Sequence, residues 1–184
     1  YFKVEPIKWR ILSEGGGNAL ILCESIIANK AFGNSNNYAK SEIRAWLNNE
    51  FYNSAFNAVQ RALIKTTEVE NSVYSTGYDP NPYVCTNTFD KIFLPSFRDV
   101  TNTAYGFNVG GSTSDTARTK TASDYTRATG ACVNSGNGYW WLRSPLYGSS
   151  YYARYVSSNG IVLDFSRVYY TSFGLVPALT ISLD

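Results

Sequence analysis

The tripeptide Ser158-Asn159-Gly160 separates two runs of strand-forming residues, and it constrains the fold more than any other part of the chain. Asn-Gly between such runs is a strong signal for a tight hairpin turn. Residues 152–157 and 161–168 are therefore predicted to pair as antiparallel strands. Successive side chains point to opposite faces of a strand, so the second run has one apolar and one more polar face: Ile161, Leu163 and Phe165 against Val162, Asp164 and Ser166.

The N-terminal part of the chain predicts another hairpin and two helices. Residues 2–12 and the apolar run 19–23 flank the flexible turn Gly15-Gly16-Gly17-Asn18. Ser41 is predicted to cap a first helix, and a second is expected to begin near Asn53-Ser54. Helical spacing predicts that both helices bury an apolar face against the sheet: Ile43, Trp46, Leu47 and Phe51 in the first, and Phe56, Val59 and Leu63 in the second.

The rest of the chain predicts short elements between long irregular loops, which cover residues 66–88 and 101–121. The short elements are a strand over 91–94, a capped turn from Ser96 to Asp99, a helix from Ser123 to Thr129 ended by Gly130, and strands over 139–142 and 174–181. Pro177 implies an edge or a bulge in the last strand. Residues 1–184 are expected to form a single α+β domain.

Histidine is absent from the 184 residues, which excludes Ser-His-Asp and Cys-His catalysis and His-ligated metals. Cys23, Cys85 and Cys132 are odd in number and widely spaced, so they are expected to be buried free thiols rather than disulfides or zinc ligands. We expect no metal and no other cofactor. The net charge of +2 is scattered, which argues against nucleic-acid binding.

No apolar run approaches the length needed to span a bilayer, and the first residues lack the pattern of a secretion signal. The absence of Met suggests a trimmed fragment, whose signal or anchor would lie outside this sequence.

The segment 146–173 has the composition of an adaptable binding surface. Tyr, Ser, Gly and Asn account for 15 of its 28 residues, and this mixture is typical of antibody paratopes. A plainer interpretation is that Tyr and Ser line the solvated face of an antiparallel sheet. If the segment binds, its ligand contacts are predicted to lie largely on one exposed face: Tyr147, Tyr151, Tyr155, Asp164, Phe165, Arg167, Tyr169, Tyr170 and Phe173.

Four phrases, at residues 1–10, 41–48, 139–145 and 174–179, together resemble a family of bacterial domains that is frequent in gut-dwelling bacteria. That family is related to the formylglycine-generating-enzyme branch of the C-type lectin fold. The resemblance spans nearly the whole chain. It implies a C-type lectin-like fold, with two helices packed on a small twisted antiparallel sheet and long irregular loops.

The same branch includes the variable proteins of diversity-generating retroelements. In these proteins, a diversified ligand-binding segment lies between a W-L-R-S-like phrase and a G-V-R-P-A-like phrase, the place that residues 146–173 occupy here. Mutation of adenines in Asn-type codons would yield the Tyr, Ser, Asn, Asp, Gly and Phe that are abundant in this segment. The chain departs from many relatives at Val176, where they carry Arg, and this puts in doubt any ion pair of that Arg.

The leading hypothesis is a non-catalytic module on a bacterial surface or a phage that binds a protein or a glycan. No Glu-Pro-Asn or Trp-Asn-Asp phrase supports calcium-dependent sugar binding. One alternative is an oxidase similar to the formylglycine-generating enzymes, for which Cys132 is the only late cysteine. Another is a purely structural module of a larger surface protein.

The aromatic phrases themselves favour structural roles. Large aromatic residues dominate core burial, so all four tryptophans are expected to support the core: Trp9, Trp46, Trp140 and Trp141. Arg143 is expected to tie loop carbonyls or a carboxylate together rather than to hold a substrate.

Overall fold

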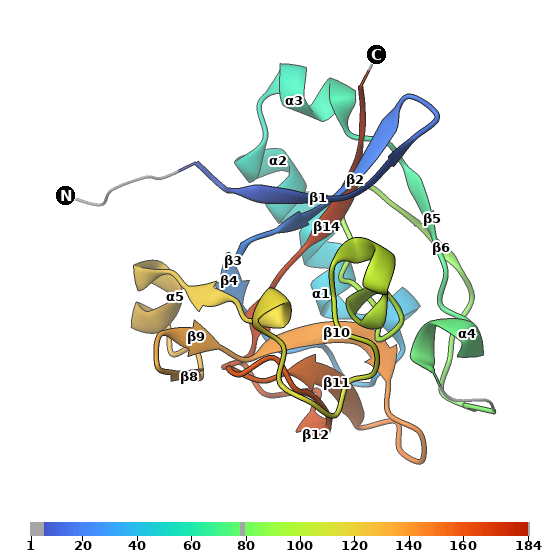
Figure 1. Cartoon of the computed structure of the whole chain (residues 1–184), viewed down its shortest axis with the longest axis vertical. Helices are drawn as coiled ribbons and strands as arrows, with labels where there is room; N and C mark the ends of the chain where they lie inside the picture. The colour runs from blue at the N-terminus through green and yellow to red at the C-terminus, as the bar shows by residue number, and fades with distance from the viewer. Residues whose placement is uncertain (1–5, 78–79, 184) are drawn as a thin grey trace.

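The computed structural model describes residues 6–77 and 80–183, which form a mixed α+β fold of short helices and small sheets (Figure 1). Residues 2–5 of the first predicted strand and Asp79 in the predicted loop over 66–88 lie outside this description. Within it, no helix combines the length and the apolar content that crossing a bilayer requires.

Two sheets carry most of the fold. The three-stranded sheet has the order β1-β2-β14 and consists of Trp9–Gly15, Asn18–Cys23 and Ala178–Ser182. The five-stranded sheet has the order β12-β11-β10-β13-β4 and consists of Val162–Arg167, Tyr152–Val156, Trp140–Pro145, Gly174–Leu175 and Ala28–Asn29. Both predicted hairpins are thus confirmed, as β1-β2 and β11-β12, and both are antiparallel.

The remaining strands form two minor sheets. One has the order β3-β7-β9-β8, from Ser25–Ile26, Thr121–Ala122, Asn137–Gly138 and Val133–Asn134. The other pairs β5 and β6, which are Thr67–Val69 and Thr88–Asp90.

The helical elements are all short. Ser41 caps α1 (Glu42–Trp46), the start of the predicted first helix, because its Oγ accepts a hydrogen bond from the Arg44 amide. The elements are η1 (Tyr38–Lys40), α1 (Glu42–Trp46), η2 (Leu47–Phe51), α2 (Tyr52–Ala55), α3 (Ala58–Leu63), α4 (Val73–Thr76), η3 (Asp99–Thr101), η4 (Thr103–Tyr105), η5 (Thr116–Arg118) and α5 (Asp124–Ala128). The predicted Ser96–Asp99 turn is confirmed by reciprocal hydrogen bonds between these two residues and leads into η3, and the predicted helix capped by Ser123 is confirmed as α5.

The predicted second helix is present as α3, but its predicted start near Asn53-Ser54 and its buried stripe are wrong. The first helix runs on through η2 and α2 to Ala55, and α3 begins only after Asn57, which forms a capping box with Gln60. Val59 is 75% exposed and Leu63 is 41% exposed. Because α3 has only six residues, the buried Ile64 that follows it fixes it to the core, while its own side chains stay outside.

Residues 66–77 and 80–88 are more ordered than predicted. Strand β5, helix α4 and the start of β6 lie in this range, and Asn71 bonds across it to Thr88. Hydroxyl and amide side chains dominate this region, and such side chains can form hydrogen bonds with nearby backbone groups. Because few residues here are apolar, the sequence shows no alternation of apolar and polar residues from which strands could be predicted. Residues 91–94 form no strand, and Phe93 alone bridges Ala178.

Val176 and Pro177 lie where the last predicted strand breaks into two. Residues before the break, in β13, pair with β10 and β4, and residues after it, in β14, pair with β2. Pro177 cannot donate a ladder hydrogen bond, but its carbonyl accepts one from the Cys23 amide at 2.9 Å. One short segment therefore joins the two principal sheets (Figure 1).

The core contains side chains from both principal sheets and from the first helix. Trp140 and Trp141 are fully buried, as predicted, whereas Trp9 and Trp46 are only partly buried. The prediction that all four tryptophans support the core is therefore correct for β10 and too strong for the other two. Trp46 lies at the margin of the helical face whose centre carries the buried Ile43 and Leu47.

Arg143 has the structural role predicted for it. Its guanidinium donates to the Leu94 carbonyl at 2.8 Å, to the Asp99 carboxylate at 2.6 Å, and to the Glu70 carbonyl at 3.2 and 3.3 Å. Burial alone would raise the pKa of Asp99, but the Arg143 charge and the Ser96 amide outweigh burial and hold that pKa below its usual value.

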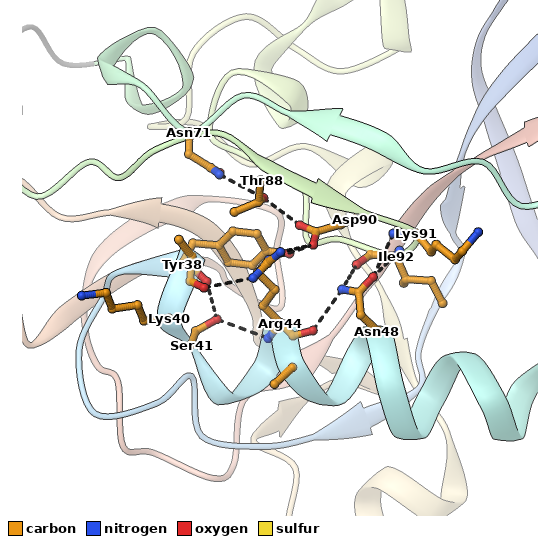
Figure 2. Close-up of polar contacts among 12 residues, drawn as sticks. Tyr38, Lys40, Ser41, Arg44, Asn48, Asn71, Thr88, Asp90, Lys91 and Ile92 are labelled. Atoms are coloured by element: carbon orange, nitrogen blue, oxygen red, sulfur yellow. Dashed lines mark hydrogen bonds and ion pairs between the residues drawn. The ribbon is translucent and has the colours of Figure 1, made fainter.

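A second polar cluster fixes α1 to β6, as Figure 2 shows. The Asp90 carboxylate accepts from Arg44 Nη2 at 2.7 Å and from the Thr88 hydroxyl at 2.7 Å. The Asn48 side-chain oxygen accepts from the Lys91 and Ile92 amides at 2.8 and 3.2 Å. The charged and polar groups of this cluster are engaged with one another, which indicates a structural clamp.

Candidate functional site

A row of aromatic and apolar side chains lies on one side of the five-stranded sheet, next to its edge strand β12. Trp141 pairs with Tyr155 across β10 and β11, and Tyr155 pairs with Leu163 across β11 and β12, so these side chains share that side. We call the following set the aromatic face: Tyr139, Tyr155, Leu163, Phe165, Arg167, Tyr169 and Tyr170.

The solvent side of β12 carries the apolar Leu163 and Phe165 together with Arg167, and its covered side carries the polar Asp164 and Ser166 together with Val162. Leu163 is 37% exposed and Phe165 is 76% exposed, whereas Ser166 is 4% exposed. A half-buried strand normally does the opposite, because burial of apolar area stabilises the fold. The apolar face predicted for this strand is therefore its solvent face, and a surface of this kind is typical of contact with another molecule.

Asp164 does not belong to the aromatic face, which corrects its predicted role as a ligand contact. Its carboxylate forms an ion pair with Arg154 Nε at 3.0 Å. The Arg154 guanidinium is buried and lies 4.3 Å from the ring centre of Phe97. This pair accounts for the inverted burial of β12, because the charged Arg154 needs a partner on the covered side of the sheet.

Phe173 is also corrected: it is 8% exposed and supports the aromatic face from beneath. Its ring stacks on Trp141 at 4.5 Å between centroids and meets Tyr155 edge-on at 4.9 Å. The Tyr170 ring is nearly parallel to that of Phe173, with centroids 6.4 Å apart. The exposed rings therefore rest on rigid core aromatics, which fixes their positions before any ligand arrives.

The C-terminal end of β12 holds the most exposed polar groups of the face. Arg167 Nη1 donates a hydrogen bond of 2.5 Å to the Tyr169 hydroxyl, and the Tyr169 and Tyr170 rings meet edge-on at 5.3 Å. Burial raises the pKa of the neighbouring Tyr155 hydroxyl, which therefore stays protonated. A ligand would meet one cation and several hydroxyl groups among apolar rings.

Tyr147 and Tyr151 lie in the turn between β10 and β11, at the end of the sheet where Arg167 lies. They are 50% and 61% exposed, and the Tyr151 carbonyl accepts a hydrogen bond from the Val168 amide at 3.0 Å. The turn is thus adjacent to the aromatic face and extends the same surface.

The cysteines give no sign of activated thiol chemistry. Burial raises the pKa of the Cys23, Cys85 and Cys132 thiols, and an activated cysteine needs the opposite shift. All three are free, but only Cys23 is buried as predicted; Cys132 is exposed. Its exposure follows from the neighbouring Gly130, Ser135 and Gly136 turns, which carry no apolar cover. Among the residues described, no group of acidic or thiol side chains could hold a metal ion.

A family model described as "Domain of unknown function (DUF6273)" matches residues 16–183. The chain belongs to the DUF6273 family. The matched range includes every residue of the aromatic face, so this surface is part of the DUF6273 domain. No match to the chain was found among curated proteins or among solved structures.

The sequence prediction missed two members of the aromatic face. Leu163 was visible in the alternation of β12, but alternation does not say which side faces the core. Tyr139 lies outside the Tyr- and Ser-rich segment, directly before β10, and joins the face because its ring centroid lies 6.0 Å from that of Tyr155. Leu163 and Tyr139 come together on this face only because the strands pair, and the sequence alone does not show which strands pair.

Proposed function

We propose that this domain is a non-catalytic binding module, displayed on a bacterial surface or a phage, which holds its ligand on the aromatic face. The observation that carries the proposal is the inverted burial of β12, with Phe165 exposed and Ser166 covered. An aromatic ring exposed on an edge strand promotes aggregation. A surface of this kind is therefore typical of a site that a binding partner covers.

Of the two ligand classes, protein and glycan, the aromatic face favours a protein. Tyr, Phe and Arg are enriched at protein interfaces, and Tyr and Arg are common among the residues that dominate their energies. The face stands on strands and ends at the edge of a sheet, a place where an extended polypeptide can add its own strand. Phe165 and Tyr169 would be the principal anchors.

We further propose that the fold is C-type lectin-like and that residues 146–173 correspond to the variable segment of the retroelement-diversified proteins. The placement of Tyr151, Tyr169 and Tyr170 on the surface supports this, since diversified positions must be exposed to act on a ligand. Val176, where relatives carry Arg, is fully buried here among apolar neighbours, so this chain lacks any ion pair of that Arg.

The oxidase alternative draws less support. It requires a reactive late cysteine, and the pKa of Cys132 is raised rather than lowered. In the alternative of a purely structural module, the aromatic face would pack against a neighbouring domain of the same protein instead of binding a separate ligand.

The test compares a double variant of the face with a matched control. Phe165→Ser with Tyr169→Ser removes both anchors, and Phe89→Ser removes a similarly exposed ring, 67% exposed, from the edge of the β5-β6 sheet. Each protein is screened against purified surface proteins of gut bacteria and against a glycan array. We expect protein ligands that bind the wild type and Phe89→Ser but not the double variant, with all three melting temperatures alike.

Ligands that bind the double variant as well as the wild type would contradict the proposal. Binding confined to glycans would replace the protein ligand by a sugar. Thiol-dependent oxidation of a cysteine peptide that Cys132→Ser abolishes would favour the oxidase.

A further inference from the structure

A groove of about 530 Å³ lies between the first helix and the segment around β4, beside the aromatic face but distinct from it. Glu42, Trp46 and Glu50 line it from the helix at intervals of four residues, which places them along one helical side. Asn29, Lys30 and Thr171 line the opposite side. A second hollow of about 720 Å³ continues it toward Tyr125, which is 63% exposed.

Trp46 offers one face of its indole to this groove. Phe51 stacks on the ring with centroids 5.5 Å apart and an interplanar angle of 22°. The Lys30 ammonium lies over the ring at 5.1 Å from its centre. An ammonium in this position is attracted by the negative face of the aromatic ring, so the groove already holds one cation of the chain itself.

Two hydrogen bonds fix the backbone of Lys30. Its carbonyl accepts a hydrogen bond of 3.0 Å from the Trp141 indole, and its amide donates one of 3.1 Å to the Phe173 carbonyl. The four-carbon side chain is flexible and strongly hydrated at its tip. It can therefore leave the Trp46 ring without disturbing the core.

The charge balance of the groove favours a cation from outside. Its lining contains two carboxylates, Glu42 and Glu50, against the single ammonium of Lys30. If the Lys30 side chain swings into solvent, an aromatic ring and two carboxylates remain, the combination that recognises amines. Sugars also stack on tryptophan, but the ammonium that occupies the ring here indicates cation chemistry.

We propose that this groove binds a primary amine, such as a lysine side chain of a peptide, with Lys30 as a built-in competitor for the Trp46 ring. The inference stands apart from the proposed function, because it uses none of the exposed rings of the aromatic face. It makes one testable demand: removing the positive charge of Lys30 must strengthen the binding of a cationic ligand at Trp46.

The experiment is an NMR titration of the full chain with a trilysine peptide, followed at the Trp46 indole N–H signal, which Trp46→Phe assigns. The Nε-acetylated peptide is the uncharged control. We expect Lys30→Gln to bind trilysine about two- to fivefold more tightly than the wild type, the effect of removing one exposed cation–π competitor. Glu50→Gln should weaken binding by a similar factor.

Matched variants separate this site from general charge effects. Lys8→Gln and Glu14→Gln make the same charge changes at exposed positions outside the groove and should leave the affinity unchanged. The proposal fails if trilysine leaves the Trp46 signal unmoved, if the acetylated peptide binds equally well, or if Lys30→Gln binds no more tightly. A neutral oligosaccharide that moves the same signal equally in the wild type and Lys30→Gln would assign the groove to sugars instead.

Discussion

Two phenylalanines of the same segment show how much a single position decides. Phe165 stands exposed on β12, and Phe173, eight residues later, is stacked on Trp141 in the core. The composition of the segment does not distinguish these two phenylalanines, and both were predicted as ligand contacts. Only the pairing of strands distinguishes the ring that a ligand can reach from the ring that supports it.

Phe173→Ala is therefore expected to cost about 3–5 kcal/mol of unfolding free energy, the usual range for a buried aromatic ring. Phe165→Ala should change the unfolding free energy by no more than about 0.5 kcal/mol, because its ring is 76% exposed. Reversible urea denaturation of both variants measures the difference. Equal losses would show that the burial assigned to the two rings is wrong.

The Arg143–Asp99 pair predicts an acid-labile fold. Because the pKa of Asp99 is lower in the folded chain than in the unfolded one, the pair stabilises the fold above about pH 4, the ordinary carboxyl range. That contribution is lost as pH falls through the folded pKa. We expect the unfolding free energy to decline below about pH 4, and Asp99→Asn to lower it at pH 7 and to flatten this decline. An unchanged pH profile in Asp99→Asn would refute the assignment.

At the scale of elements, Gly160 allows the turn of the β11-β12 hairpin to pack closely against Asp115. Its φ is +81°, and a Cβ added there would lie 2.0 Å from the Asp115 carbonyl oxygen. Both the left-handed backbone and the close approach exclude a side chain. Gly160→Ala should therefore destabilise the fold by about 1–3 kcal/mol or more, as judged by thermal unfolding.

Gly148→Ala is the matched control, since Gly148 has a φ of +99° but nothing within 4 Å of an added Cβ. It tests the cost of the backbone alone. If Gly160→Ala proves no worse than Gly148→Ala, the contact with Asp115 contributes nothing.

Elements with a local signal were predictable, and those that depend on distant partners were not. The Asn159-Gly160 turn and the Ser41 cap are each recognisable from a few consecutive residues, and both lie where they were predicted. Strands β5 and β6 pair across a gap of eighteen residues with only three residues each, too few for a recognisable alternation. The stripe in α3 failed because helical spacing continues through Phe56 even though the helix itself stops at Ala55.

The candidate site follows the same rule. Exposure of Tyr151, Tyr169 and Tyr170 was predictable from composition, because a core seldom contains so many hydroxyls. The inward turn of Asp164 was not, because it depends on the buried Arg154 of the neighbouring strand. The groove at Trp46 joins residues from 29 to 171, which no local motif connects.

For the whole molecule, the segment through Val176 and Pro177 couples the two principal sheets. We expect native-state hydrogen exchange to show the amides of Ile21 in β2 and Tyr155 in β11 opening with one free energy, that of global unfolding. Because β13 and β14 connect the two sheets, opening one sheet would also disrupt the other and would therefore require a free energy close to that of global unfolding. Markedly weaker protection of β2 would mean that the sheets unfold independently.

The position of β14 also sets the order in which this chain can fold during its synthesis. Strand β2 leaves the ribosome well before its outer partner, β14, because most of this domain lies between the two strands in the sequence. Until then, the N-terminal hairpin has an unpaired edge of apolar residues, which neighbouring nascent chains could join. We therefore expect production of this domain to depend on holding chaperones, and slower translation to prolong the vulnerable interval.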